Sequence, residues 1–392
     1  MKKVFVTDGR SLAALAIVRS LGQKGIKIHC GEEFRHNITF FSRYVQKRVI
    51  YPSPQKEPLK FLNAILEMVK SEKYDMIMPV RDETSLLLSR HKEVLSRYTE
   101  LYLADYEVMN TFRDKGETVR AALKHNIPCP KTYFPEETGI AEIKDNAPYP
   151  LLIRPRVSSG SRGIRPVKNS DELDSAYIKV KDEYGEPIIQ EQIPKSGYCT
   201  ACVLLDCDCR NIAAFTYERV KEYPLSGGPT VVGISCINEP IKEHALRLLR
   251  GLKWTGVAEV EFIIDADGEP KLLEVNPRFW MPLNLAIYSG VDFPYLLYRL
   301  AMGEMVEPVT SYKTGMKYRW VLPSEVLWLM QTSDKLQGLK EFFNFWEGGT
   351  CYGELSLSDP MPVAGVMLQA LNYAASAEKR GLIFNRGWVL RK

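Results

Sequence analysis

Residues 256–278 read GVAEVEFIIDADGEPKLLEVNPR, and this stretch decides how the middle of the chain folds. Two segments in which apolar and polar residues alternate, 257–264 and 271–278, flank the turn sequence DADGEP. This pattern is typical of an antiparallel hairpin. Successive side chains of a strand point to opposite faces, so the apolar residues of the first segment share one face. Glu259 and Glu261 are therefore predicted to lie on the other face.

Two acidic residues that oppose each other in this hairpin predict a metal site. A regular ladder closed by the six-residue turn pairs residue 264 with residue 271 and sets Glu261 opposite Glu274. Carboxylates that face each other across a ladder repel unless a cation lies between them. Magnesium prefers oxygen ligands and binds through one or two carboxylates together with substrate phosphates. The alternative is a solvated face of the hairpin, on which charged residues are common.

An arginine follows the second carboxylate strand. By the same register Asn276 lies opposite Glu259, and Arg278 comes two residues later, so its guanidinium is expected near the predicted metal. A metal, carboxylates and an arginine together form a set that handles phosphate. The alternative for Arg278 is a surface salt bridge with a nearby glutamate, which is the commoner fate of an arginine.

A loop of small residues, 157–163 (VSSGSRG), is a second candidate for phosphate binding. It connects two predicted strands. Gly160 and Gly163 allow the backbone to turn its N–H groups toward an anion, and the hydroxyls of Ser159 and Ser161 add donors. The loop lacks the spacing of a Walker loop, and many Ser/Gly loops are merely flexible hairpin tips.

Two basic residues lie near this loop in the predicted structure. Arg154 ends the strand that enters the loop, where it is able to hold a phosphate with two hydrogen bonds. Lys115 borders the apolar stripe of a helix predicted over 111–125, and its long side chain can carry the ammonium into a cleft. An exposed helical lysine is the commoner alternative for this residue.

Composition and charge exclude several classes of protein. The 392 residues are 45% apolar and 26% charged, which is typical of globular domains and not of disordered chains or coiled coils. The net charge of +4 is too small to suggest a nucleic-acid or membrane partner. The chain has neither a long apolar run nor the start of a signal peptide, so we expect a cytoplasmic protein with reduced cysteines.

Four of the eight cysteines lie close together in the sequence, at positions 199, 202, 207 and 209. Their spacing, C-x2-C-x4-C-x-C, differs from that of a zinc knuckle. A hairpin that turns at 206–208 is the favoured interpretation, with cysteine acting as a small apolar residue. The five histidines are scattered, so any metal is expected to be held by carboxylates.

The order of predicted elements divides the chain into four parts. Residues 1–110 alternate strands, including 101–103, with helices, which predicts a parallel, doubly wound sheet. The first strand is not followed by G-x-G-x-x-G, so a dinucleotide site is not supported. Residues 111–195 and 196–310 mix helices with hairpins. Residues 311–392 are expected to form a helical extension rich in aromatic residues.

In this order the chain resembles the ATP-grasp superfamily, which includes carboxylate–amine ligases and the large chain of carbamoyl-phosphate synthetase. The features that carry the resemblance are Asp114-Lys115, the IPCP segment 127–130, Arg154-Pro155 with its Ser/Gly loop, QEQI at 190–193, and EVNPR at 274–278. The resemblance extends to about residue 310. It implies a pre-ATP-grasp α/β domain (1–110), an ATP-grasp subdomain with a lid loop (111–195) and a second with the metal site (196–310).

The resemblance also implies roles for individual residues. ATP would lie between the two subdomains, with Mg²⁺ or Mn²⁺ bridging its phosphates to the protein. The implied nucleotide-binding residues are Lys115, Arg154, Ser159, Gly160, Ser161, Gly163, Glu191, Gln192 and Ile193. The implied metal residues are Glu261, Glu274 and Asn276, and Arg278 would support the transition state of phosphoryl transfer.

The sequence departs from the family pattern at two places. The family usually has lysine where Arg154 stands, and many members have a glutamate for the ribose where this chain has Tyr198 and Cys199. Arg219, Lys221 and the loop 226–229 are similar to a family segment that borders the acceptor site.

The resemblance implies an ATP-dependent ligase that activates a small-molecule carboxylate as an acyl phosphate for attack by an amine, releasing ADP and phosphate. The alternatives are a thiol, bicarbonate or hydroxyl acceptor, or a nucleotide-binding regulator without turnover. The substrates cannot be named from the sequence. A homodimer through the first domain is the working hypothesis for the assembly.

Overall fold

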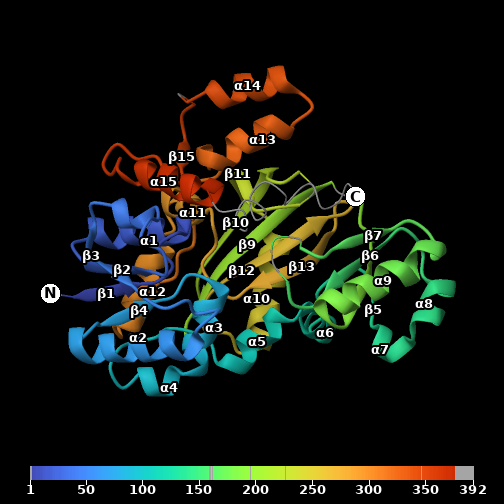
Figure 1. The fold of residues 1–392 in the computed structure, drawn as a ribbon, viewed down its shortest axis with the longest axis horizontal. Coiled ribbons are helices and arrows are strands. Elements are labelled where there is room, and N and C mark those ends of the chain that lie inside the picture. The colour runs from blue at the N-terminus through green and yellow to red at the C-terminus, as the bar shows by residue number, and fades with distance from the viewer. Residues whose placement is uncertain are drawn as a thin grey trace.

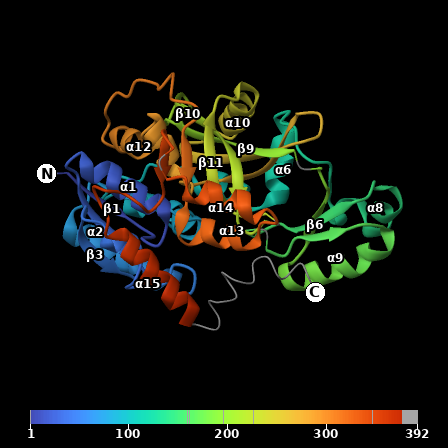
Figure 2. The same ribbon diagram turned by 90° about the horizontal axis from the view of Figure 1, so that it is seen from above.

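A computed structural model describes residues 2–158, 160, 162–194, 196–225, 227–345 and 347–375. The predictions for Ser159 and Ser161 fall outside this range. Three bodies lie side by side: a parallel α/β domain, a large central sheet, and a small sheet with its helices (Figures 1 and 2). No helix in the described part of the chain is long and apolar enough to cross a membrane.

The first domain is the predicted parallel sheet, with strand order β3-β2-β1-β4. Its strands are β1 (Lys3–Val6), β2 (Lys27–Glu32), β3 (Val45–Ile50) and β4 (Met76–Met78). Its helices are α1 (Leu12–Gln23), η1 (Thr39–Phe41), α2 (Pro58–Glu72), α3 (Asp82–Arg90) and α4 (Lys92–Leu95). The apolar residues of α1 are buried on nearly all sides, because the sheet covers one flank while α11 and α12 pack on another.

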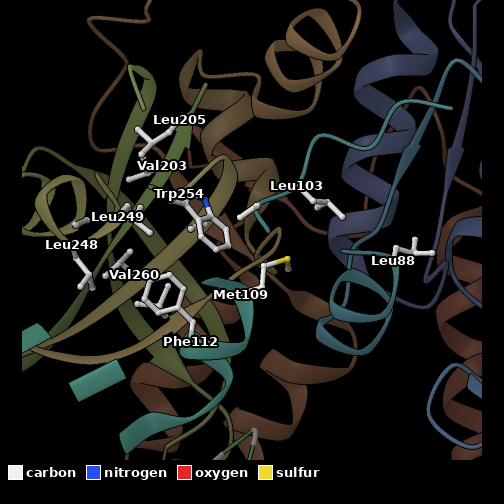
Figure 3. Close-up of a cluster of buried hydrophobic side chains, with 14 of the residues drawn as sticks. Leu88, Leu103, Met109, Phe112, Val203, Leu205, Leu248, Leu249, Trp254 and Val260 are labelled. Carbon is white, nitrogen blue, oxygen red and sulfur yellow. The ribbon is translucent and has the colours of Figure 1, made fainter. Parts of the chain in front are cut away.

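The strand predicted at 101–103 does not form. Only Glu100 bridges to the sheet, opposite Met76, and the chain then leaves it. Leu101 and Leu103 are nevertheless buried, because they pack in a cluster that joins the first domain to the central sheet. Figure 3 shows Leu103 in this cluster with Met109, Phe112 and Trp254. The apolar run is thus core packing between domains and not a strand.

The small sheet has the order β5-β8-β6-β7. Its strands are β5 (Thr132–Tyr133), β6 (Leu151–Pro155), β7 (Arg165–Val167) and β8 (Pro187–Glu191). The helices of this part are α5 (Tyr106–Arg113), α6 (Lys115–Lys124), α7 (Pro135–Thr138), α8 (Ile140–Asn146) and α9 (Ser170–Tyr184). The helix predicted over 111–125 is divided at Asp114, because Asp114 is extended and its carboxylate accepts hydrogen bonds from the N–H groups of Gly116 and Glu117.

The central sheet has seven strands in the order β13-β12-β9-β10-β11-β14-β15. Five of them come from the middle of the chain: β9 (Gly197–Leu205), β10 (Asn211–Glu222), β11 (Thr230–Cys236), β12 (Gly256–Ile264) and β13 (Pro270–Asn276). The helices α10 (Glu239–Gly251), α11 (Leu283–Ser289) and α12 (Phe293–Ala301) follow β11 and β13. Apolar residues on one face of β9 and β12 pack with α10, while the other face carries most of the polar residues.

The C-terminal part was predicted to be helical, but the structure shows that it also contains strands. Two of its segments, β14 (Lys317–Arg319) and β15 (Thr350–Tyr352), extend the central sheet, and β14 pairs antiparallel with β11. The other elements are η2 (Val321–Glu325), α13 (Val326–Gln331), α14 (Lys335–Phe343) and α15 (Pro362–Ala375). Strands of three residues are too short to show a period of two in the sequence, so the aromatic-rich pattern suggested helices alone.

Candidate active site

The hairpin of β12 and β13 sets Glu261 opposite Glu274 and Glu259 opposite Asn276, as predicted. The turn differs from the prediction, because Ile264 pairs with Pro270 and not with residue 271. A bulge between Glu261 and Phe262 shifts the ladder by one residue and restores the predicted pairs. The four polar side chains therefore lie on one face of the central sheet.

Side chains of the neighbouring strands extend this polar face. Thr200 of β9 lies between Glu261 and Tyr217 in the ladder, and Tyr217 of β10 donates its hydroxyl to Glu259 at 2.9 Å. The amide nitrogen of Asn276 donates to both Glu259 and Glu261 at 3.0 Å. Burial and the charge of Glu261 raise the pKa of Glu259 to about 8. No pattern in the sequence predicts the contact with Tyr217, because Tyr217 comes from a strand two positions away in the sheet.

Protein cations neutralise the opposed carboxylates. Arg219 of β10 forms an ion pair with Glu261, and the Nζ atom of Lys115 lies 3.5 Å from Oε2 of Glu274. Removal from water would raise the pKa of Glu274, but the positive charges of Lys115 and Arg154 outweigh this effect and lower it. The sequence predicted a cation between Glu261 and Glu274. In this structure the positive charge comes from the side chains of Arg219 and Lys115.

Arg278 lies at the junction of the central sheet and the first domain. Its Nη2 donates to Oδ1 of Asn276 at 3.0 Å, and its Nη1 donates to the carbonyl of Phe279 at 2.9 Å. Its Nε donates to Asp82, at the start of α3, at 3.1 Å. Burial lowers the pKa of Arg278, but Asp82 and Glu259 more than compensate, so the guanidinium stays charged. Asp82 was missed by sequence reasoning.

The small sheet contributes one further buried cation, Arg154 of β6. Arg154 is 6% exposed, and one of its Nη atoms is hydrogen-bonded to the side-chain carbonyl of Gln190. Its Nε has no hydrogen-bond partner in the described structure. Burial lowers the pKa of Arg154, and the negative charges of Glu274 and Glu261 oppose this effect only in part. A buried guanidinium with an unpartnered N–H group suits an anionic ligand.

Lys115 links the small sheet to the central sheet. It is the first residue of α6 and only 8% exposed, contrary to the alternative of a solvated lysine. Its ammonium donates to the carbonyl of Ser158 at 2.7 Å as well as approaching Glu274. Lys115 therefore connects the beginning of the predicted lid loop with the predicted metal site.

The predicted loop meets Lys115 through the carbonyl of Ser158, and the segment 190–193 meets Arg154 through Gln190. Gly160 and Gly163 have φ of 62° and 77°, and a Cβ at Gly163 would lie 2.7 Å from atoms of Pro155 and Tyr184. Residues 190–193, the segment QEQI that resembles the family's hinge, begin in β8 and lead out of the small sheet. No hydrogen bond or ion pair of the described structure joins Glu191, Gln192 or Ile193 to Lys115 or Arg154. The residue of this segment that binds Arg154 is Gln190.

Metal binding by cysteine and histidine is not supported. No group of three His, Cys, Asp or Glu side chains suited to a metal occurs among the described residues. Cys199 and Cys202 lie on opposite faces of β9, in different clusters of the core. The predicted magnesium site differs from such a group because it consists of two carboxylates, Glu261 and Glu274, and the amide of Asn276. These are the hard oxygen donors that magnesium prefers.

Comparison with known proteins agrees with this geometry. Residues 112–282 match the family described as the ATP-grasp domain. The biotin carboxylase of Nostoc sp. is 23% identical over 218 residues, which are 50% of this chain and 47% of that protein. The D-aspartate ligase of Enterococcus faecium is 25% identical over 281 residues, or 63% of this chain and 65% of the ligase. The chain spans less than half the length of the first curated relatives that it matches.

Solved structures share the fold. The biotin carboxylase of Campylobacter jejuni, in its complex with β-γ-ATP, has a TM-score of 0.68 at 17% identity and covers 81% of this chain and 74% of its own. All of the site residues described above except Asp82 lie within residues 112–282, the part of the chain that matches the ATP-grasp domain. The parallel sheet of the first domain precedes the matched residues, in the position predicted for a pre-ATP-grasp domain.

Proposed function

We propose that the protein is an ATP-dependent ligase that activates a small-molecule carboxylate as an acyl phosphate and joins it to an amine. The observation that carries the proposal is the meeting of Lys115 and Arg154, from the small-sheet side, with the carboxylates and Arg278 of the central sheet. The Nζ atom of Lys115 lies 3.5 Å from Oε2 of Glu274, and Arg154 is buried with an Nε that has no partner in the described structure. Cations that come together with two carboxylates suit a magnesium nucleotide.

Each set of side chains has a separate task. Arg154 and Lys115 would bind the phosphates, and Glu261, Glu274 and Asn276 would hold magnesium. Bound Mg²⁺ supplies charge neutralisation for the phosphates when present. Arg278 would donate hydrogen bonds to the transferring phosphoryl group, whose charge spreads over its equatorial oxygens. The substrate carboxylate attacks the γ-phosphorus, and ADP leaves. The amine then attacks the acyl carbon, and inorganic phosphate leaves with no covalent help from a side chain.

Two comparisons bear on the acceptor. The D-aspartate ligase relative aligns with 63% of this chain, which favours an amine acceptor. The biotin carboxylase relatives favour a second candidate, in which bicarbonate is the carboxylate that is activated. The presence of Arg278, Glu261 and Glu274 in one site supports an enzyme over a regulator without turnover. A regulator has no need of a group such as Arg278 that stabilises a transition state.

The test is a screen of carboxylates, including bicarbonate, with and without amines, for release of ADP in the presence of Mg²⁺. The expected result is ADP and inorganic phosphate in equal amounts, and a hydroxamate when hydroxylamine replaces the amine. Arg278→Ala serves as the inactive reference and should lower kcat far more than it raises KM for ATP. Stoichiometric AMP and pyrophosphate would contradict acyl-phosphate formation.

A further inference from the structure

Arg219 forms an ion pair with Glu261, one of the carboxylates that the proposed metal site requires. A hydrogen bond joins Nη2 of Arg219 to Oε2 of Glu261, and the two side chains are only 9% and 14% exposed. Arg219 reaches Glu261 from β10 by crossing the intervening strand β9. Its guanidinium carbon lies 4.9 Å from the centre of the Tyr198 ring, which supports the side chain on the way.

Arg219 also has a second carboxylate within reach. Its Nη1 lies 3.5 Å from Oε2 of Glu222 and 3.2 Å from the carbonyl of Gly228, while its Nε lies 3.2 Å from the hydroxyl of Thr230. The nearby Glu261 and Glu222 raise the pKa of Arg219 above its ordinary value in spite of burial, so it remains a cation. The guanidinium therefore lies between two carboxylates, one in the metal site and one outside it.

Competition follows from the chemistry of the shared oxygen. A divalent ion binds Glu261 through the same lone pairs that accept the hydrogen bond from Arg219. Arg219 and a metal would also repel each other strongly at such short range in a site with little water. The metal and the arginine cannot both hold this oxygen, and Glu222 offers the displaced arginine a compensating charge.

We infer that Arg219 occupies the metal's place at Glu261 while the site is free of metal, and turns toward Glu222 when a divalent cation binds. This inference rests on the metal site of the proposed function. It explains how two opposed, poorly solvated glutamates are kept neutralised without ligand. On this inference, metal binding also moves the guanidinium of Arg219, next to the segment that is expected to border the acceptor.

The test measures the affinity of Mn²⁺ for the complex of the full chain with ADP, by water-proton relaxation. Arg219→Met removes the competitor and should tighten Mn²⁺ binding about tenfold, the amount expected for one charge-assisted hydrogen bond. Lys271→Met is the matched control. Lys271 is a cation on β13 whose neighbours in the ladder share the face of Arg219, but its partner is Asp265, at 3.7 Å. This control should change Mn²⁺ affinity less than twofold.

A second variant acts in the opposite direction. Glu222→Gln removes the site to which Arg219 would turn, so it should weaken Mn²⁺ binding severalfold. Because Glu222 is outside the metal site, this variant keeps the test informative if Arg219→Met does not fold. Unchanged or weaker Mn²⁺ binding by Arg219→Met, or equal tightening by Lys271→Met, would overturn the inference, and so would unchanged binding by Glu222→Gln.

A structure with Mn²⁺ and ADP gives the direct view. Separation of Arg219 from Glu261 is expected, and an intact ion pair beside bound metal would overturn the inference. The outcome is distinguishable from failure of the proposed function. A wild-type chain that binds no Mn²⁺ with ADP contradicts both, whereas normal binding without the predicted change in the variants contradicts only the role of Arg219.

Discussion

At the scale of single residues, Arg154 is the side chain whose environment is best suited to bind an anion. It is buried, Gln190 fixes one Nη, and its Nε is unpartnered. Arg154→Ala should therefore weaken ATP binding by roughly ten- to hundredfold, the loss expected for one charge-assisted contact. Arg154→Lys should lose less, because a charge remains although the two-pronged geometry does not. Isothermal titration with ATP measures both changes.

The neighbouring Arg156 provides the control for Arg154. Its side chain forms ion pairs with Asp114, Glu117 and Glu136. None of these is a side-chain partner of Arg154 or Lys115 in the described structure. Arg156→Ala should leave ATP affinity within about twofold of wild type, since it removes a partly exposed charge network. Equal losses in the two alanine variants would mean that Arg154 acts through general charge and not through a contact with nucleotide.

Glu32 in the first domain predicts a dependence of stability on pH. It is 1% exposed, and burial raises its pKa from the ordinary 4.5 to about 7. Because the folded state binds this proton more tightly than the unfolded state, Glu32 favours folding at low pH, and this contribution is lost as pH rises from about 4.5 through 7. Glu32→Gln should flatten the decline of Tm over that interval. Glu57→Gln, in the same domain but paired with exposed Lys60, is the control and should keep the wild-type slope.

At the scale of elements, Asp114 does two things for the helix that carries Lys115. It caps α6 through the N–H groups of Gly116 and Glu117, and it accepts hydrogen bonds from Nε of Arg156 at 2.9 and 3.0 Å. Asp114→Ala should lower the free energy of unfolding by about 1–2 kcal/mol, the usual cost of a lost cap. Asp114→Asn keeps the cap and should cost less. Urea unfolding monitored by circular dichroism measures the difference, and equal losses would assign the effect to the ion pair.

The elements also show what the sequence can and cannot predict. Long periodic patterns predicted α1, α2 and both hairpins of the central sheet, because each pattern reports burial on one face. The pairing of Glu261 with Glu274 was predicted correctly although the turn was not, since a bulge offsets the one-residue error. The segment 101–103 was wrongly predicted as a strand, because three apolar residues are compatible with a strand or with a packed loop. The strands β14 and β15 were missed, because strands of three residues are too short to show a period of two.

At the scale of the whole molecule, the site depends on contacts between distant parts of the chain. The pairs Lys115–Glu274, Arg219–Glu261 and Arg278–Asp82 each join different strands or domains. The types of these residues suggested chemistry in the sequence, but their partners could not be predicted. The order of strands in the central sheet decides that Arg219 crosses β9 to Glu261, and the docking of the first domain decides that Asp82 meets Arg278.

That docking predicts a contribution of the first domain to the rate of the chemical step. Asp82 begins α3 and accepts a hydrogen bond from Nε of Arg278 at 3.1 Å, which holds the guanidinium beside Asn276. Asp82→Asn keeps the shape of the contact but removes its charge, so the orientation of Arg278 becomes less fixed. We expect kcat to fall by roughly ten- to hundredfold while KM for ATP changes little, because an orienting contact matters most in the transition state.

The adjacent Glu83 separates this effect from a general loss of charge at the helix. Glu83 lies in the same first turn of α3, but its partner is Arg81, at 3.6 Å. Glu83→Gln should keep kcat within about twofold, since an exposed ion pair of this kind contributes little. Asp82→Glu should restore part of the rate lost in Asp82→Asn, because it returns a carboxylate to Arg278. An unchanged kcat in Asp82→Asn, or an equal fall in Glu83→Gln, would mean that the first domain does not act on the site through Arg278.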